Sequence, residues 1–447
     1  MARSRNRAQR TQEEIDNDAR VRWGRLFYEE EKRQQNLARL QLTAPRNDSG
    51  DEGGALCPKY DRILRVQGAD RVLRMCNFSP AEFERLWDVL EDHVLAHWNV
   101  GRGKKSTHPP KDILFMTIGA LKHCSNWDVV SSMFEIDPSP FQKMVRKFLS
   151  MLEPFLYDAF VVGEERRWKM KKLTLSGHSF KNFPSARYAT DVTFQQSNRP
   201  TGGYSNAKKY FSGKHHLYGY KVEVSVLPIG AAINCTKFEP GAVADVTIFR
   251  DNGAFHRSAM RKLPDEADLS DDGPLSAAYG NDWGVLTDKG YQGLADEYRA
   301  IHPKKKARGA PPLTLDELQN NDKIAHDRVI VENFFGRLKT LWGVCSHKWE
   351  WDDKSYNMFF RACVVLTNYS VRCCPLRRED GECFLRYEAR LIQIGLEIEA
   401  EKKRKRQEYR DGRRARLELT ARDGTRRRLS LGRSQNASPC STTYGSP

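Results

Sequence analysis

Three acidic residues in the middle of the chain have the types and positions needed to bind metal ions together. Asp191 stands at the end of a predicted strand, Asp288 directly follows a later one, and Glu332 lies inside a predicted helix. Hard divalent cations such as Mg²⁺ and Mn²⁺ prefer oxygen ligands. Two such ions about 3.5–4 Å apart can activate water or a 3′-hydroxyl and stabilise the leaving oxygen of a phosphodiester. Each acid alone is more simply explained as a strand-end or turn residue, but the three together predict phosphoryl transfer.

The predicted helix 326–341 carries two bases beside its acid. Glu332 lies among valine and phenylalanine residues, where burial of a carboxylate without a partner is costly. At about 100° per residue, Arg328, Glu332 and Lys339 fall within about 40° of one another. We therefore expect an amphipathic helix, docked on a sheet, that presents one acid between two bases.

A mixed α/β domain is predicted to position these acids. The chain changes at about residue 186 from helical periodicity to segments rich in Val, Ile, Tyr and Phe, and a short helix is expected at Val243–Phe249. Strands followed by alternating helices and strands indicate an α/β class. The predicted strands are Ala186–Phe194, Leu217–Leu227, Ile229–Phe238 and Trp283–Thr287.

A helical block is expected before this domain. Ser79 has the position of an N-cap, with Pro80 at the first helical position and Glu82 at the capping-box offset. Two later helices joined by the turn Glu135–Pro138 form a plausible helix-turn-helix. The second of them is expected to expose side chains suited to phosphate and base-edge contacts, although an ordinary helical subdomain explains the pattern equally well. These side chains are Gln142, Lys143, Arg146 and Lys147.

The composition limits the classes of protein that the chain can belong to. It has 447 residues, with 74 Lys and Arg against 58 Asp and Glu, so its net charge is +16. No apolar run approaches the roughly 18–20 residues of a membrane span, and we expect no membrane partner. The ten cysteines lack the spacing of a disulfide framework or a zinc site. The excess of positive charge predicts an acidic partner.

Four segments are expected along the chain. Residues 401–447 contain 14 Lys and Arg against 5 Asp and Glu, which concentrates more than half of the net charge in a tail typical of nuclear import or phosphate contact. The predicted segments are a basic arm and linker (1–75), a helix-turn-helix-like domain (76–160), the α/β catalytic domain (161–382) and a basic helical or disordered tail (383–447).

An ordered set of motifs resembles the catalytic domain of DDE-type transposases, most closely the PIF/Harbinger class. The resemblance covers roughly residues 186–377. The motifs are Asp191-Val192-Thr193; Lys208-Lys209-Tyr210-Phe211-Ser212-Gly213-Lys214 leading to Gly219-Tyr220-Lys221-Val222; Pro240-Gly241 followed by Asp245; Thr287-Asp288-Lys289-Gly290-Tyr291; Pro303-Lys304-Lys305-Lys306-Ala307-Arg308-Gly309; and Arg328 through Glu332 to Gly336-Arg337-Leu338-Lys339.

The resemblance implies an RNase H-like core and a set of functional residues. It assigns catalysis and metal binding to Asp191, Asp288 and Glu332, and a supporting role to Asp245. In related bacterial transposases, the bases that match Arg328 and Lys339 approach DNA phosphate. Two departures are Ala325, where the bacterial pattern has tyrosine, and Thr287, where glycine often stands before the second aspartate. We also expect the lysines Lys304, Lys305 and Lys306 to contact DNA.

The resemblance further implies a nuclear Mg²⁺- or Mn²⁺-dependent endonuclease that cleaves and joins double-stranded DNA at transposon ends. Its expected partners are DNA, a Myb-like accessory protein and further copies of the chain. One alternative is a domesticated, transposase-derived protein that binds DNA without transposition activity. A nuclease acting on RNA–DNA hybrids would use the same metal chemistry.

Overall fold

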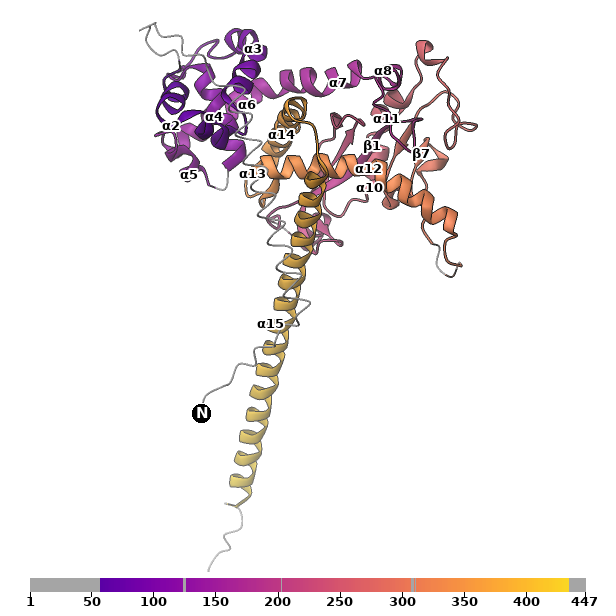
Figure 1. The fold of residues 1–447 in the computed structure, drawn as a ribbon. Helices are drawn as coiled ribbons and strands as arrows, with labels where there is room; N and C mark the ends of the chain where they lie inside the picture. The colour runs from indigo at the N-terminus through magenta and orange to yellow at the C-terminus, as the bar shows by residue number, and fades with distance from the viewer. Residues whose placement is uncertain (1–56, 124–125, 202, 307–308, 310, 434–447) are drawn as a thin grey trace, which may run out of the picture.

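The computed structural model describes residues 57–123, 126–201, 203–306, 309 and 311–433. The first 56 residues of the expected arm, two residues of the expected basic loop (307–308) and the last 14 residues of the expected tail lie outside the described residues. Figure 1 shows a helical region at the N-terminal side, a sheet with helices around it, and one long helix that extends away from both.

The N-terminal region is helical from Pro58 onward. The predicted capping box is confirmed, because Ser79 accepts from the backbone of Glu82, and the Glu82 carboxylate accepts from the backbone of Ser79. The helices are α2 (Pro58–Cys76), α3 (Pro80–His97), α4 (Pro110–His123), α5 (Trp127–Ser132) and α6 (Pro138–Tyr157), followed by a π-helical turn (Asp158–Val162), α7 (Gly163–Arg167) and α8 (Met170–Leu175).

Helix α2 occupies the part of the chain where an arm and linker were expected. The buried carboxylate of Asp112, in the first turn of α4, accepts from the backbone N–H groups of Lys59 and Tyr60 at 3.1 and 2.9 Å. Residues 58–75 are therefore an integral part of the helical region. The low apolar content of this segment concealed the helix from pattern analysis.

A seven-stranded mixed sheet forms the centre of the molecule. Its strands are β1 (Ala186–Gln196), β2 (Phe211–Ser212), β3 (Leu217–Val226), β4 (Ala232–Cys235), β5 (Glu239–Pro240), β6 (Gly284–Leu286) and β7 (Ala300–Ile301). The order is β2-β3-β1-β6-β7, and β4 and β5 both pair with β3. The β1–β3 pair is antiparallel, whereas β1–β6 and β6–β7 are parallel.

Two strand predictions need correction. Asp191 is an interior residue of β1, paired with Val224, and not a strand-end residue. Only β4 (Ala232–Cys235) forms within the strand expected at Ile229–Phe238, and the short strand β5 (Glu239–Pro240) begins after it, because the chain leaves the sheet between them.

Helices cover both faces of the sheet. The face toward α12 (Leu315–Leu341) and α14 (Asp353–Cys373) shares one continuous apolar core with the N-terminal helices. On the opposite face, Tyr188 and Trp283 pack in a second apolar cluster with Phe249 of α10 (Asp245–Asp251) and residues of α11 (Gly253–Met260). The short helices α9 (Tyr204–Lys209) and α13 (Gly343–Ser346) complete the fold, together with 3-10 turns at Pro264–Glu266, Lys289–Tyr291 and Leu294–Asp296.

The last helix, α15 (Arg378–Arg433), begins within the sheet domain and ends far from it (Figure 1). A Cβ atom on Gly336 of α12 would lie 1.6 Å from the carbonyl oxygen of Asp380, so glycine permits α12 and α15 to touch. Beside it, Arg337 and Asp380 form a buried two-pronged ion pair at 2.8 and 3.0 Å. From residue 400 to residue 419, in contrast, all side chains are exposed except at Gly412. The expected tail thus combines a docked base with a projecting basic rod.

Within the described residues, no helix is both long enough and apolar enough to cross a membrane.

Candidate active site

The three acids singled out by the sequence come together over the middle of β1, beside the end of β6. Asp191 lies in the middle of β1, Asp288 follows the neighbouring strand β6 and begins a 3-10 turn, and Glu332 lies on α12, which crosses this face. The side chains of Asp191 and Glu332 are 18% and 19% exposed, and that of Asp288 is 43% exposed. The site is therefore lined by carboxylates and open to solvent on the Asp288 side.

The guanidinium of Arg328 bridges the three acids. One terminal nitrogen, Nη1, lies 2.8 Å from Asp191 Oδ2, while Nη2 lies 2.7 Å from Glu332 Oε1 and 3.6 Å from Asp288 Oδ1. Arg328 and Glu332 are one turn apart on α12, so the helix delivers the cation and one acid together. All three acids thus share a single positive charge.

Burial and charge act in opposite directions on Asp191. Removal of its carboxyl from water raises its pKa, Arg328 lowers it and the nearby Asp288 raises it, and together these effects bring the pKa to about 7. A backbone hydrogen bond from Val192 to Asp191 Oδ1, at 2.8 Å, also favours the ionised form. A carboxyl group with this raised pKa gains strongly from any additional positive charge.

The donor set suits a hard divalent cation. It consists of carboxylate oxygens from three elements, which already converge on one positively charged group. Among the residues that the structure describes, no three acidic, histidine or cysteine side chains are arranged closely enough to hold a metal ion. The acids surround the Arg328 guanidinium instead. Their oxygen atoms are suitable ligands for a divalent cation, but Arg328 occupies the position between them.

Asp245 lies beside the site and has its own partner. Its Oδ1 forms an ion pair with Lys221 Nζ at 2.9 Å, and the lysine also donates to the carbonyl of Val243 at 2.8 Å. A Cβ atom on Gly290, two residues after Asp288, would lie 3.6 Å from Asp245 Oδ2. Asp245 therefore borders the Asp288 turn, while Lys221 holds its carboxylate.

Lys339 does not join the acids, contrary to the helical-wheel expectation. Its ammonium donates to the carbonyls of Cys345 and Phe194 at 2.8 and 3.4 Å and lies over the ring of Tyr387. The residue is 6% exposed, and burial lowers its pKa to about 8. Lys339 lies seven positions after Glu332, about 10 Å further along the helix, so its side chain is past the site, and α15 covers it. A residue in this position cannot approach DNA phosphate.

We expect the buried lysine to make the protein more stable at alkaline pH. The pKa of Lys339 is lower in the folded state than in the unfolded state. The free energy of unfolding is therefore reduced at and below pH 8 and recovers as the pH rises toward 10.5. Between pH 8 and pH 10 the recovery should be about 2 kcal/mol. Urea unfolding of the wild type and Lys339→Met, compared at both pH values, measures it. A difference between the two proteins that stays constant with pH would contradict the prediction.

The expected basic loop lies close to the Asp288 turn. Gln292, in this turn, donates to the carbonyl of Pro303 at 3.2 Å. Lys304 is exposed and pairs with Glu317 of α12 at 3.1 Å, and its neighbours Lys305 and Lys306 are exposed. The loop therefore adds positive charge on the side where Asp288 is open to solvent.

The four residues proposed for the second helix of a helix-turn-helix divide into two pairs on α6. Lys143 and Lys147 are exposed, and Lys147 lies over the ring of Trp98. Gln142 and Arg146 are half-buried, and Arg146 forms an ion pair with Asp352 at 2.6 Å. Since Arg146 joins α6 to the start of α14, it serves as a contact between the two regions of the molecule.

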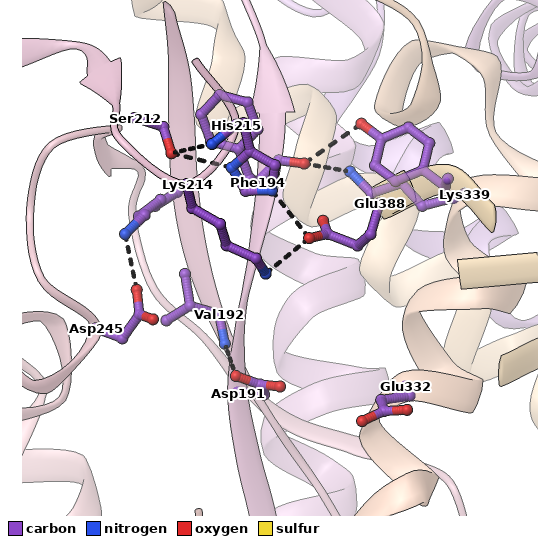
Figure 2. A network of polar contacts seen from close by, with 12 residues as sticks. Asp191, Val192, Phe194, Ser212, Lys214, His215, Asp245, Glu332, Lys339 and Glu388 are labelled. Atoms are coloured by element: carbon purple, nitrogen blue, oxygen red, sulfur yellow. Dashed lines mark hydrogen bonds and ion pairs between the residues drawn. The ribbon is translucent and has the colours of Figure 1, made fainter. Parts of the chain in front are cut away.

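A second polar network fastens α15 to the sheet (Figure 2). Glu388 of α15 accepts from His215 Nε2 and from Lys214 Nζ, both at 2.9 Å, while His215 Nδ1 lies 3.0 Å from the hydroxyl of Ser212. Although burial raises the pKa of Glu388, His215 and Lys214 lower it to about 2. The loop between β2 and β3 is thereby connected to the helix that also covers Lys339.

Acidification should weaken this attachment. The pKa of Glu388 is lower folded than unfolded, so its contribution is complete above pH 4.5 and is lost as the pH falls toward 2. Between pH 6 and pH 3 the loss should be about 2 kcal/mol. Chemical unfolding of wild type and Glu388→Gln at pH 6 and pH 3 measures it, with the exposed Glu397→Gln on the same helix as control. An equal acid sensitivity of wild type and Glu388→Gln would refute it.

Sequence reasoning assigned no role to Lys221 or Glu388. A signal for Lys221 was present, because it is a charged residue in a strand that is otherwise largely apolar. Glu388 gave no such signal, since it lies in a charged segment where a solvated side chain is the ordinary expectation.

The chain was also compared with known proteins. Residues 190–368 match the family of DDE superfamily endonucleases. The matched segment begins one residue before Asp191, contains Asp288 and Glu332, and ends within α14. No curated protein and no solved structure gave a significant match to the chain. The seven-stranded mixed sheet flanked by helices is consistent with a DDE nuclease fold.

Proposed function

We propose that this protein is a metal-dependent DNA endonuclease and transposase of the PIF/Harbinger class. The observation that carries the proposal is the convergence of Asp191, Asp288 and Glu332 on one guanidinium within a segment that matches DDE endonucleases. The ordered motifs around them support the class and an RNase H-like core. The substrate in this proposal is double-stranded DNA at transposon ends, and the reaction is hydrolysis followed by strand transfer.

Asp191, Asp288 and Glu332 would hold two Mg²⁺ or Mn²⁺ ions, and these ions would supply charge stabilisation and activation of the attacking hydroxyl group. Asp191 is rigid because it belongs to a central strand, whereas Asp288 and Glu332 approach it from a turn and a helix. Arg328 offsets part of their negative charge and lies where a divalent cation would have to bind. Lys221 keeps Asp245 from competing for them.

The distribution of charge supports a polyanionic substrate. Lys304, Lys305 and Lys306 lie near the open side of the site, and the exposed residues 400–419 carry nine Lys and Arg against four Asp and Glu. Such regions attract phosphate and make binding fall steeply as the salt concentration rises. We further propose a nuclear location, a homo-oligomeric assembly and a Myb-like accessory protein that strengthens site recognition.

Sequencing of DNA ends tests the proposed reaction. The full chain is incubated with DNA carrying the ends of its own element, with Mg²⁺ or with a chelator, and new 3′-hydroxyl ends are mapped. We expect defined breaks that need the metal and are absent with Asp288→Asn. DNA binding without cleavage would favour the domesticated alternative. Cleavage restricted to RNA–DNA hybrids would identify a different nuclease.

Removal of Arg328 should strengthen the response to divalent cations. In Arg328→Gln the three acids lose their common counter-ion, so the protein without metal should be less stable. Added Mn²⁺ then has no guanidinium to compete with. It should raise the melting temperature of the variant by about 2–4 °C more than that of the wild type. Calorimetry measures the shift, and Arg250→Gln, which loses only an exposed pair with Glu297, is the control. An equal shift in all three proteins would refute competition between arginine and metal.

A further inference from the structure

A cavity of about 490 Å³ lies beyond the acids at the end of the β1–β3 pair. Aromatic rings form much of its wall, and the remaining lining is polar, with two exposed cations. Its volume falls within the range of pockets that bind small ligands. The aromatic residues are Tyr210, Tyr220, Trp349 and Trp351, and the cations are Arg199 and Lys209.

The aromatic walls are held in place by a larger cluster. The rings of Trp349 and Trp351 lie 5.0 Å apart between centroids, and Trp351 stacks on Trp127 of α5 at 4.6 Å. Tyr220 contacts Tyr210 at 5.9 Å and is 3% exposed. Rigid, preformed aromatic surfaces are suited to stacking against a planar guest.

The cavity also contains polar groups with unused capacity. Trp349 is 4% exposed, and its indole Nε1 has no hydrogen-bond partner among the described residues. The amide groups of Asn198 and Asn206 also line the cavity and can read hydrogen-bonding edges.

The charges favour an anionic guest over a cationic one. Within the described part of the chain, neither Arg199 nor Lys209 takes part in an ion pair, whereas the one lining acid, Asp353, accepts from the hydroxyl of Tyr220. An aromatic cage for a methylated lysine needs the opposite balance, because cations at its rim would repel the ammonium. Aromatic walls with free cations instead fit a base and its phosphates.

The cavity faces the same side of the sheet as the acids. Asp191 and Gln195 are four residues apart on β1, so their side chains share a face, and Gln195 pairs in register with Tyr220. Tyr356 contacts both Gln195 and Tyr220: its hydroxyl donates to Gln195 Oε1 at 3.0 Å, and its ring centroid lies 4.7 Å from that of Tyr220. Four strand residues span about 13 Å, which is about four nucleotides at 3.4 Å each.

We propose that this cavity binds one unpaired nucleotide of the DNA strand that is cleaved at the three acids. The proposal rests on the nuclease function proposed above. The base stacks on the half-buried rings of Tyr210 and Trp351, the two asparagine amides contact its polar edges, and Arg199 and Lys209 pair with the flanking phosphates. The protein thereby selects DNA that is unpaired close to the cleavage position.

Binding to two matched duplexes tests the proposal without any cleavage. One duplex is fully paired and the other has a single unpaired nucleotide, and both are measured with the full chain in the presence of a chelator. We expect the second duplex to bind at least about tenfold more tightly, because base–aromatic stacking contributes at this level. Trp351→Leu should reduce the preference to below about threefold. Equal binding of both duplexes by the wild type would overturn the proposal.

Two neighbouring lysines provide the matched charge control. Lys209 lines the cavity and Lys208 does not, although both are exposed. Lys209→Gln should weaken binding of the unpaired duplex more than that of the paired duplex, whereas Lys208→Gln should affect both equally. The same loss of preference in both variants would refute a specific site.

Photo-crosslinking tests the cavity in the wild-type protein, so the result does not depend on whether a variant folds. With 5-iodouracil as the unpaired base, we expect wild-type crosslinks at Tyr210, Trp349 or Trp351, and crosslinks only elsewhere would refute the proposal. A free nucleoside triphosphate should bind only at millimolar concentration, and submicromolar binding would instead assign the cavity to a soluble nucleotide. Asp288→Asn should keep the preference for the unpaired duplex while losing cleavage. The experiments therefore distinguish a wrong assignment of the cavity from a wrong assignment of the nuclease function.

Discussion

Replacement of Glu332 by glutamine should lower the rate of metal-dependent DNA cleavage by about 10³-fold or more, because metal-site charge stabilisation contributes several kcal/mol. The amide keeps the size of the side chain but removes one of the three negative charges at the site. A single-turnover assay with saturating protein and labelled DNA measures the chemical step directly. DNA affinity, measured with a chelator, should remain within a few-fold of that of the wild type.

Asp322→Asn is the matched control for this variant. It removes one negative charge from the same helix, but Asp322 is exposed and lies ten residues before Glu332. It should cleave at the wild-type rate. If Glu332→Gln cleaves as fast as Asp322→Asn, the assignment of Glu332 to the metal site is wrong.

Replacement of Gly336 by alanine should destabilise the whole protein by about 3–5 kcal/mol or prevent its folding. The new methyl group would lie 1.6 Å from the carbonyl oxygen of Asp380, which belongs to the backbone of a helix and cannot turn aside. Separation of α12 from α15 also breaks the buried Arg337–Asp380 pair and exposes the covered core of α12. Equilibrium unfolding in urea measures the loss.

Gly412→Ala tests whether this effect depends on contact and not on glycine itself. Gly412 lies in the projecting part of α15, and a Cβ atom there would have nothing within 4 Å. Alanine favours the helix over glycine by up to about 1 kcal/mol, so this variant should be as stable as the wild type or more stable. Equal destabilisation by both substitutions would contradict the proposed close packing.

Local features of the fold were predictable because they depend on neighbouring residues. The capping box at Ser79, the strand that carries Asp191 and the helix that carries Glu332 all follow from short-range patterns. The three acids were also found in this way, through their positions relative to strands and a helix. Their identification needed no knowledge of the contacts that bring them together.

Features that depend on distant contacts were missed or misplaced. Lys339 has the right helical angle for the site, but α15 covers it and its pKa falls to about 8. The helical periodicity places Arg146 on the face expected to contact DNA, but Arg146 pairs with Asp352, which lies more than 200 residues away in the sequence. Helical periodicity describes one element and contains no information on which element packs against it.

The sequence by itself determined the chemical groups of this protein: three carboxylates on separate elements, an excess of positive charge and a basic tail. Only the tertiary structure decided how they are used. It placed Arg328 among the three acids, buried Lys339 beneath α15 and gathered aromatic side chains from distant segments around one cavity. The physical reason is range, since residue type and local spacing set charge and secondary structure, whereas burial and ion pairing depend on the residues that folding brings nearby.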